Sequence, residues 1–159
     1  MKFLRTIRLD PSDVNVFPLA AEPGEWAVPG TFAFADVEPE TLSRKEQLAF
    51  KNGWLGTDSF GRSTFVQVVD ISDRKFEDVV QRLAAHFVDA YGAPDLPAAL
   101  GPARDEATYA AELAQHRGLT LLAMERDFTD QGVSERVSVV TPKDDGLHAR
   151  IWEIVDDED

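Results

Sequence analysis

The clearest pattern of apolar and polar positions predicts a strand followed by a long helix between residues 61 and 94. Thr64–Ile71 is rich in β-branched and aromatic residues, which is typical of a well-buried strand. In the next segment apolar residues recur at spacings of three and four: Phe76, Val79, Val80, Leu83, Ala84, Phe87 and Tyr91. This spacing indicates a helix with one apolar face packed on a core. Ser72 or Asp73 can cap its start, and Gly92 fits the position after its last turn.

The first third of the chain shows weaker strand patterns. Lys2–Leu9 predicts one strand and Val14–Ala20 a second, joined as a hairpin by the Asp10–Asp13 turn. After Trp26–Val28, the Thr31–Ala35 segment alternates large and small residues with a period of two. We therefore expect a further strand there, with both of its phenylalanines facing the core.

Two more helices are expected on either side of the central unit. Glu40–Asn52 predicts a surface helix with a narrow apolar side and Gly53 in the capping position. Trp54–Gly61 follows as a predicted loop that leads into the central strand. Beyond a connector, Pro102–Arg117 predicts a second long helix. Its alanine-rich inner side implies a close approach to another helix or to the sheet.

The last third is predicted to be β-structure. Leu119–Phe128 and Val133–Thr141 form a predicted hairpin around a short turn, and Leu147–Val155 a final strand. The predicted order, with strands first, helices in the middle and strands last, indicates an α+β fold. We expect a largely antiparallel sheet of about six or seven strands, with two long helices packed on one face and a third, short helix. Residues 1–155 are expected to form a single domain, followed by a disordered acidic tail at 156–159.

The composition narrows the possible function classes. The chain has 159 residues, of which 29 are acidic and 16 basic, and its formal net charge is −13. Such a chain is poorly suited to nucleic acids and to anionic membranes, so neither is an expected partner. The absence of cysteine excludes disulfides, thiolate metal sites and cysteine nucleophiles. Because no apolar run approaches about 20 residues and no signal-peptide pattern is present, we expect a soluble cytoplasmic protein.

One segment resembles a phosphate-binding loop. Gly56–Ser63 matches the pattern G-x-x-x-x-G-K-[ST], except that Arg62 replaces the lysine. Phosphate binding needs a strand before this loop and a helix after it, whereas here a predicted helix precedes the loop and a predicted strand follows. Asp58 inside the loop would also repel a phosphate. We therefore interpret the segment as a connector whose shape the glycines permit.

Other patterns of catalysis or metal binding are missing from the sequence. The three histidines, His86, His116 and His148, form no pair at helical or strand spacing. The chain also lacks the G-x-S-x-G elbow of serine hydrolases. The sequence therefore predicts no catalytic residue, no metal site and no cofactor.

Two charged residues are candidates for holding a small ligand. Arg62 could bind an anion as a bidentate donor in a pocket near Gly53–Arg62. Asp70 lies near the carboxyl end of the central strand, a common place for functional groups in α/β folds, although the rule is weaker in antiparallel sheets. The other interpretation of Asp70 is a solvent-facing acid that favours the start of the next helix.

Three aromatic residues near turns are candidate interface residues: Trp26, Trp54 and Phe60. Aromatic side chains, and tryptophan above all, are enriched where proteins bind one another. The alternative is that these side chains pack their loops onto the core.

Several segments resemble an uncharacterised family of small bacterial proteins. They are Met1–Asp13, Ala20–Val28, Phe50–Gly56 and Ser59–Val66, so the similarity covers most of the chain. The resemblance implies no activity, cofactor or catalytic residue. It does imply an association with respiratory redox-enzyme genes, which favours an accessory role.

These observations favour a non-catalytic protein-binding or assembly protein, an accessory to a bacterial redox enzyme, whose acidic surface suits a basic partner. The alternative is a small-molecule binding protein or enzyme that holds an anionic ligand near Gly53–Arg62. A third reading is a structural subunit that is stable only as a homo-oligomer. A deep pocket with convergent polar groups beside Arg62 would favour the second reading.

Overall fold

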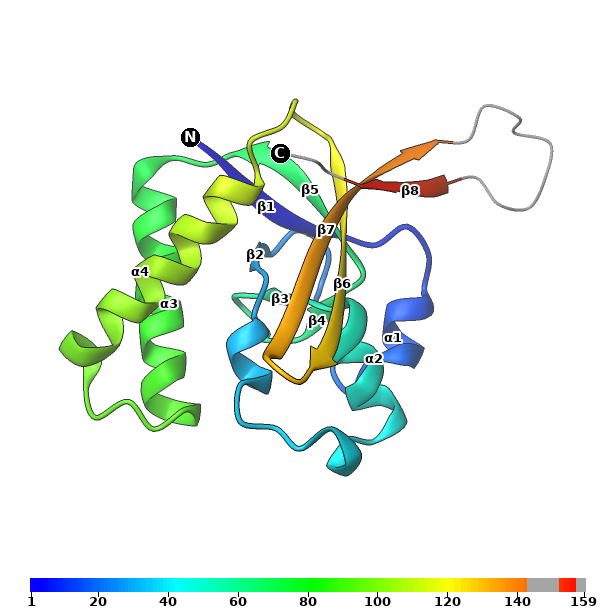
Figure 1. Ribbon diagram of the computed structural model, residues 1–159. Helices are drawn as coiled ribbons and strands as arrows, with labels where there is room; N and C mark the ends of the chain where they lie inside the picture. The colour runs from blue at the N-terminus through cyan, green and yellow to red at the C-terminus, as the bar shows by residue number, and fades with distance from the viewer. Residues whose placement is uncertain (143–151, 157–159) are drawn as a thin grey trace.

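The computed structural model describes residues 1–142 and 152–156 (Figure 1). Within these residues eight strands form one antiparallel sheet in the order β4-β3-β2-β1-β5-β6-β7-β8. The strands are β1 Lys2–Ile7, β2 Trp26–Val28, β3 Trp54–Gly56, β4 Arg62–Ser63, β5 Phe65–Asp70, β6 Leu121–Thr129, β7 Gly132–Pro142 and β8 Trp152–Asp156. The predicted α+β class and the largely antiparallel sheet are therefore confirmed, and the short strands β3 and β4 extend the sheet beyond the expected number.

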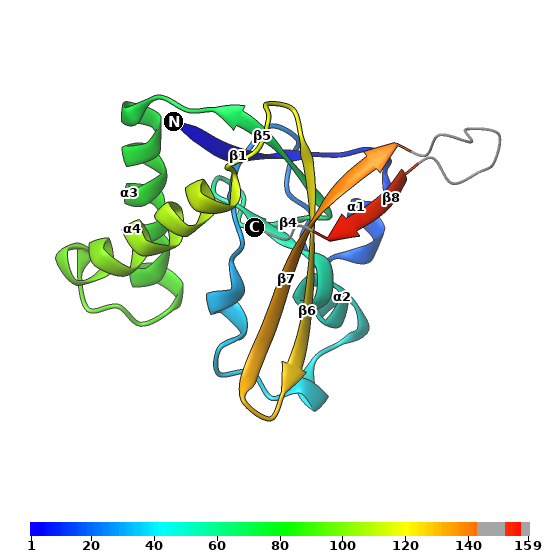
Figure 2. The same cartoon turned by 45° about the horizontal axis from the view of Figure 1, so that its top comes forward.

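Two groups of helices pack on this sheet. The α-helices are α1 Ser12–Val16, α2 Arg44–Asn52, α3 Asp73–Ala90 and α4 Leu96–Leu113, and the 3₁₀ helices are η1 Thr31–Phe34 and η2 Pro39–Thr41. Helices α3 and α4 pack side by side next to β1 and β2, and α2 packs against β6 and α1 (Figures 1 and 2). The two long helices thus share one face, as expected. In the part of the chain that the structure describes, no helix is long and apolar enough to cross a bilayer.

The central strand and helix form as the sequence predicts. The Ser72 side chain accepts a hydrogen bond from the Lys75 N–H at the start of α3, and Gly92 has a φ of 76° just past its end. The predicted apolar face of α3 is buried from Phe76 to Phe87, whereas Tyr91, at the end of the helix, is exposed. The buried face packs on β1, where the rings of Phe3 and Phe76 meet edge-on with their centres 5.8 Å apart. The main core therefore lies between this helix and the sheet.

Helix α4 begins at Leu96 instead of the predicted Pro102. The Asp95 carboxylate accepts a hydrogen bond from the Ala98 N–H, and Pro97 occupies the first turn, where a missing N–H has no cost. Because a proline fits the first turn of a helix, the helix could begin near Pro97 or near Pro102. The Asp95 cap fixes the earlier start. The predicted inner side is buried at Ala107, Ala110 and Ala114 and half-buried at Leu113, and the buried side extends back to Ala99 and Ala103.

The expected strand at Val14–Ala20 is wrong, because residues Ser12–Val16 form the short helix α1. The Asp13 carboxylate is buried and accepts hydrogen bonds from the N–H and the hydroxyl of Thr64, at 3.2 and 2.5 Å. This link to a residue far along the chain fixes the turn after β1. Strand β1 consequently pairs with β2 and β5, and the expected local hairpin does not form.

Three expectations between residues 30 and 61 are also corrected. Thr31–Phe34 forms a 3₁₀ helix and not a strand, because Gly30 turns the chain with a φ of 71°. The segment 54–56 forms strand β3 inside the predicted loop, paired with β2 and β4. Helix α2 begins at Arg44 instead of Glu40, because a reciprocal side-chain cap forms between Ser43 and the first turn.

Strands β6 and β7 form the predicted hairpin, with Thr129 opposite Gly132 at its tip. Strand β7 runs on past β6 to pair with β8. Of the predicted last strand, residues 152–155 lie in β8, whereas 147–151 lie outside the described residues. Of the expected acidic tail, Asp156 is the last residue of β8, and 157–159 lie outside the described residues.

Candidate functional site

Two buried arginines meet beside the aromatic ring of Phe34. Arg62, from β4, is only 6% exposed. Its guanidinium donates hydrogen bonds to the carbonyl oxygens of Pro29, Gly30 and Gly53 at 3.0–3.3 Å, and it lies 4.9 Å from the Phe34 ring centre. Burial, together with the positive charge of the second arginine, lowers the pKa of Arg62 to about 9. The side chain therefore remains a cation at neutral pH.

The second arginine, Arg126 from β6, is fully buried. It donates hydrogen bonds to the carbonyl oxygens of Phe50 and Gly53, at 2.7 and 3.0 Å, and to that of Pro29. Burial lowers the pKa of Arg126 as well. Because both guanidiniums donate to the Pro29 and Gly53 carbonyls, they tie the chain after β2 to the chain between α2 and β3.

Arg126 also organises a group of polar side chains at the base of the β6–β7 hairpin. Its Nε lies 2.8 Å from the Thr31 hydroxyl and 3.4 Å from Glu135 Oε1. The Thr31 hydroxyl donates to Glu135 Oε1, and the Tyr109 hydroxyl donates to Glu135 Oε2 at 2.5 Å. Partial burial, helped by this bond to Glu135, raises the pKa of Tyr109. All four side chains therefore have partners within the protein.

Glu106 joins helix α4 to this group. Its Oε2 accepts a hydrogen bond of 2.8 Å from the Gly30 N–H. Burial is the main cause that raises the pKa of Glu106, and the nearby Glu135 carboxylate acts in the same direction, whereas Arg126 and Arg62 oppose it. The polar group thus connects α4, the turn before η1 and the hairpin in one network.

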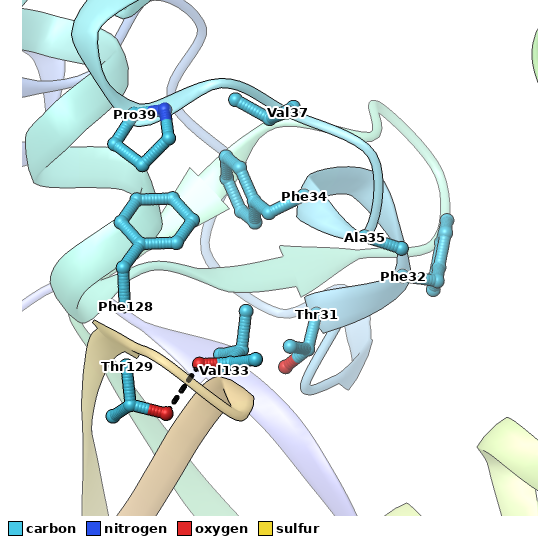
Figure 3. A pocket seen from close by; sticks show the side chains of 10 residues that line it. Thr31, Phe32, Phe34, Ala35, Val37, Pro39, Phe128, Thr129 and Val133 are labelled. Carbon is cyan, nitrogen blue, oxygen red and sulfur yellow. Dashed lines mark hydrogen bonds between the residues drawn. The ribbon is translucent and has the colours of Figure 1, made fainter.

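Beside the network, an open hollow of about 520 Å³ lies between the segment of residues 31–39 and the tip of the β6–β7 hairpin (Figure 3). Its walls are mainly apolar, with Phe34, Val37 and Pro39 on one side, Phe128 and Val133 on the other, and Thr31 and Thr129 as polar members. The Thr129 hydroxyl donates to the Gly132 carbonyl at 2.8 Å. We call this feature the apolar hollow.

The aromatic walls of the apolar hollow are held from behind by Phe50 of α2. The Phe50 ring stacks on Phe128 with ring centres 3.9 Å apart, and meets Phe34 edge-on at 5.2 Å. Phe34 in turn lies against both buried guanidiniums. The shape of the hollow is therefore set by packed side chains from three separate parts of the chain.

A model of the family of unknown function DUF6505 matches residues 1–155, and so includes the hollow and its supporting network. The chain belongs to this family. The resemblance to an uncharacterised family that the sequence predicts is therefore confirmed. Comparisons with curated proteins and with solved structures gave no significant match.

The loop of this DUF6505 protein that resembles a phosphate loop already holds an anion from its own chain. The Glu25 carboxylate is buried. Its Oε1 accepts from the N–H groups of Asp58 and Ser59 at 2.9 and 2.8 Å, and its Oε2 accepts from the Ser59 hydroxyl at 2.7 Å. A Cβ on Gly56 would lie 2.5 Å from Glu25 Oε1, so the glycine is needed for this approach. The Gly56–Gly61 loop is thus a connector closed by Glu25.

The three candidate interface residues have different environments in the DUF6505 fold. Trp54 is fully buried in the core and presents no surface to a partner, and its Nε1 has no hydrogen-bond partner within the described residues. Trp26 is half-buried, with its ring centre 6.1 Å from that of Phe3. Phe60 is half-buried and stacks on His86, with ring centres 3.7 Å apart. All three side chains contribute to packing, and an interface role for Trp26 and Phe60 stays a prediction.

The two candidate ligand residues are not brought together. Asp70 is exposed at the end of β5, opposite Lys2, whereas Arg62 is buried in β4, and three strands lie between β4 and β5 in the sheet order. Arg62 does line a smaller hollow of about 200 Å³, which it shares with Phe34, Ala33 and Phe60. We call this the Arg62 hollow.

Sequence reasoning missed Glu106, Arg126 and Glu135. Glu106 lies three residues after Ala103 and four before Ala110, and so falls on the buried alanine side of α4. Arg126 falls among the inward positions of β6 that are otherwise apolar, namely Leu122, Met124 and Phe128. These two placements are the signals that could have found them. Among residues 1–142 and 152–156, no group of histidine, aspartate and glutamate side chains is arranged to hold a metal ion.

Proposed function

We propose that this protein is a non-catalytic protein-binding protein, and that the apolar hollow is its binding site. The observation that carries the proposal is an open, mainly apolar depression of about 520 Å³ with a supported wall on each side. Exposed apolar concavities of this kind mark binding sites, because water leaves them at a gain in free energy when a partner fills them. An accessory role beside a redox enzyme, which the family resemblance implies, is part of this proposal.

The polar groups next to the hollow support binding over catalysis. Thr31 and Glu135 bond to each other and to Arg126, and Glu135 also accepts from Tyr109. Because these side chains are hydrogen-bonded to one another, they form a rigid wall. A nucleophile or general base would need a free contact with a substrate. Rigid, preformed walls lower the entropy lost on binding.

The test is purification of the tagged protein from its own cells with quantification of stoichiometric companions. Val133→Arg places a charge on the hairpin wall of the hollow, and Val14→Arg makes the same change on α1, where Val14 is exposed. Both variants change the net charge equally, so long-range attraction is matched. We expect Val133→Arg to lose the companion protein and Val14→Arg to keep it. Equal retention by both folded variants would overturn the proposal.

A second candidate function is the binding of a small anion in the Arg62 hollow, favoured by the cationic side chain in its wall. The guanidinium already donates to three carbonyl oxygens, so an anion would add to these bonds or replace one of them. Ala33→Leu narrows this hollow without touching the arginine. A metabolite thermal-shift screen that finds a stabilising anion, with the shift abolished by Ala33→Leu, would support this function. A hit that survives the substitution would exclude the site.

A further inference from the structure

We infer that the apolar hollow receives an apolar side chain from a basic segment of the partner protein, with lysine or arginine residues on either side of it. This inference rests on the proposed function and names the chemistry of the partner. Two independent features carry it: the apolar walls already described, and the charges that surround them.

The two wall segments are acidic and contain no positive charge. Neither 31–43 nor 127–135 contains a lysine or an arginine. Five acidic residues of these segments are exposed: Asp36, Glu38, Glu40, Asp127 and Asp130. Each is a sequence neighbour of a residue that lines the hollow, so their negative charges lie close to its walls, that of Asp127 on the outer face of β6.

The sixth acid of the wall segments behaves differently. Glu135 is turned inward and bonded to Arg126, Thr31 and Tyr109. Its charge is therefore offset inside the protein, and it helps to hold the wall. The exposed five have no hydrogen bond to this network, and their charges face solvent near the walls of the hollow.

Charge and shape together select one class of segment. Carboxylates around a low-dielectric depression attract a cationic segment and repel an acidic one, which raises the association rate and excludes wrong partners. The apolar walls reward an apolar side chain that enters the hollow. The volume lies within the range of about 300–1,000 Å³ that is usual for sites enclosing a small ligand. A segment that is only basic would leave the apolar walls unfilled, and one that is only apolar would leave the carboxylates without a cationic partner.

The test is selection from a phage-displayed library of random dodecapeptides on the immobilised wild-type chain. Selected peptides are then synthesised, and their affinities are measured by fluorescence anisotropy. We expect enrichment of peptides with an apolar residue flanked by lysine or arginine. We also expect their binding to weaken as salt rises from about 50 to 300 mM, because exposed charges are screened, and to be lost in Val133→Arg but kept in Val14→Arg.

Two matched charge variants separate the rim from the overall charge. The rim variant combines Asp36→Asn, Glu38→Gln and Asp130→Asn. The control combines Asp78→Asn, Asp105→Asn and Glu112→Gln, all exposed on α3 or α4. Both remove three negative charges. We expect about tenfold weaker peptide binding by the rim variant, from roughly 0.5 kcal/mol per exposed charge, and a much smaller change in the control.

The outcomes distinguish the inference from the proposed function. Equal weakening by the two triple variants would overturn the inference, since only net charge would then matter. Peptides that are apolar without basic flanks, but still sensitive to Val133→Arg, would overturn the inference and leave the hollow as a binding site. No enrichment, or peptides that bind Val133→Arg as well as wild type, would overturn both.

Discussion

Two parts of this molecule have the shape of a binding site, the Gly56–Gly61 loop and the apolar hollow, and only the hollow is open to solvent. The Gly56–Gly61 loop presents two consecutive N–H groups and a hydroxyl, and Glu25 of the same chain fills it. The apolar hollow has equally well-supported walls, and its mouth is open. The comparison shows that a motif which resembles a binding site can serve only the fold. A feature without any motif can be the better candidate for function.

The difference has a simple electrostatic basis. Backbone N–H groups that converge on one point need an anion, and a buried carboxylate supplies it with charge-assisted hydrogen bonds. The polar groups around the hollow are satisfied in the same way, by Arg126 and its partners. What remains at the hollow is apolar surface that no side chain of residues 1–142 or 152–156 covers.

Among the variants, Arg126→Met should lower the free energy of unfolding most, because Arg126 supports the wall of the hollow. The substitution removes the cation bonded to Glu135, the guanidinium donor to the Phe50 carbonyl, and one of two arginine donors to the Pro29 and Gly53 carbonyls, so we expect a loss of about 3–5 kcal/mol in the free energy of unfolding. Urea unfolding measures it. Arg104→Met, which removes an exposed ion pair with Glu77, is the control and should cost no more than about 1 kcal/mol. Similar losses in both variants would contradict a structural role for the network.

The closed loop can be opened by Glu25→Ala. Unpaired N–H groups at Asp58 and Ser59 should then cost about 2–3 kcal/mol of unfolding free energy. Acetate added at high concentration should bind in the vacated loop and raise the melting temperature of the variant more than that of wild type. Glu22→Ala, at an exposed neighbouring side chain, is the control. If acetate shifts all three proteins equally, the loop is no anion receptor.

A smaller effect is expected from Gly61→Ala, which disturbs the same loop from its other end. The new Cβ would lie 2.6 Å from the carbonyl carbon of Ala20, so the backbone must move, at a cost of about 1–3 kcal/mol. Gly101→Ala in α4 meets nothing within 4 Å and should stabilise by about 0.5–1 kcal/mol. Opposite signs in chemical denaturation are the expected result. A neutral Gly61→Ala would show that the close approach is not required.

Glu106→Gln should change the pH dependence more than the stability itself, because the amide oxygen can still accept from the Gly30 N–H. The folded state raises the pKa of Glu106, so the folded protein binds this proton more tightly than the unfolded chain does. Its contribution is therefore most favourable below the unfolded pKa and is lost as pH rises through the folded value. Wild type should lose stability relative to Glu106→Gln as pH rises from about 4 to 7. Parallel pH profiles in urea unfolding would refute this.

The smallest effect is expected from Arg82→Ala, which removes the ion pair between α3 and Asp58 of the closed loop. Both side chains are more than half exposed, so the change should stay within about 0.5 kcal/mol. Urea unfolding beside Glu25→Ala gives the comparison. A loss as large as that of Glu25→Ala would mean that the surface pair, and not the internal carboxylate, holds the loop.

Local patterns were enough to predict the parts of the fold that depend on neighbours in sequence. The β5–α3 unit has a regular apolar period, a serine cap and a terminal glycine, and it forms as predicted. The β6–β7 hairpin does so too. The strand expected at Val14–Ala20 failed because the distant bond between Asp13 and Thr64 decides that turn.

The candidate site was harder to predict because its members are scattered. Phe34 was expected in a strand facing the core, and it is buried, but in a 3₁₀ turn against two guanidiniums. Arg62 was singled out as an anion ligand, and its donors are directed at carbonyl oxygens that no local pattern connects to it. Arg126 and Glu106 become meaningful only when α4 and the hairpin are placed beside the turn at Gly30.

The position of β1 inside the sheet has a consequence for biosynthesis. Its apolar residues Phe3 and Leu4 are fully buried, yet their partner strand β5 ends only at Asp70, which pairs with Lys2. At about 5–20 residues per second, a ribosome needs roughly 3–14 s to add that partner. During this interval an apolar strand emerges without its neighbour and is open to chaperones or to another nascent chain. The β1–β5 pair can therefore close only after residue 70 has been made, and slower translation before β5 should lower the soluble yield.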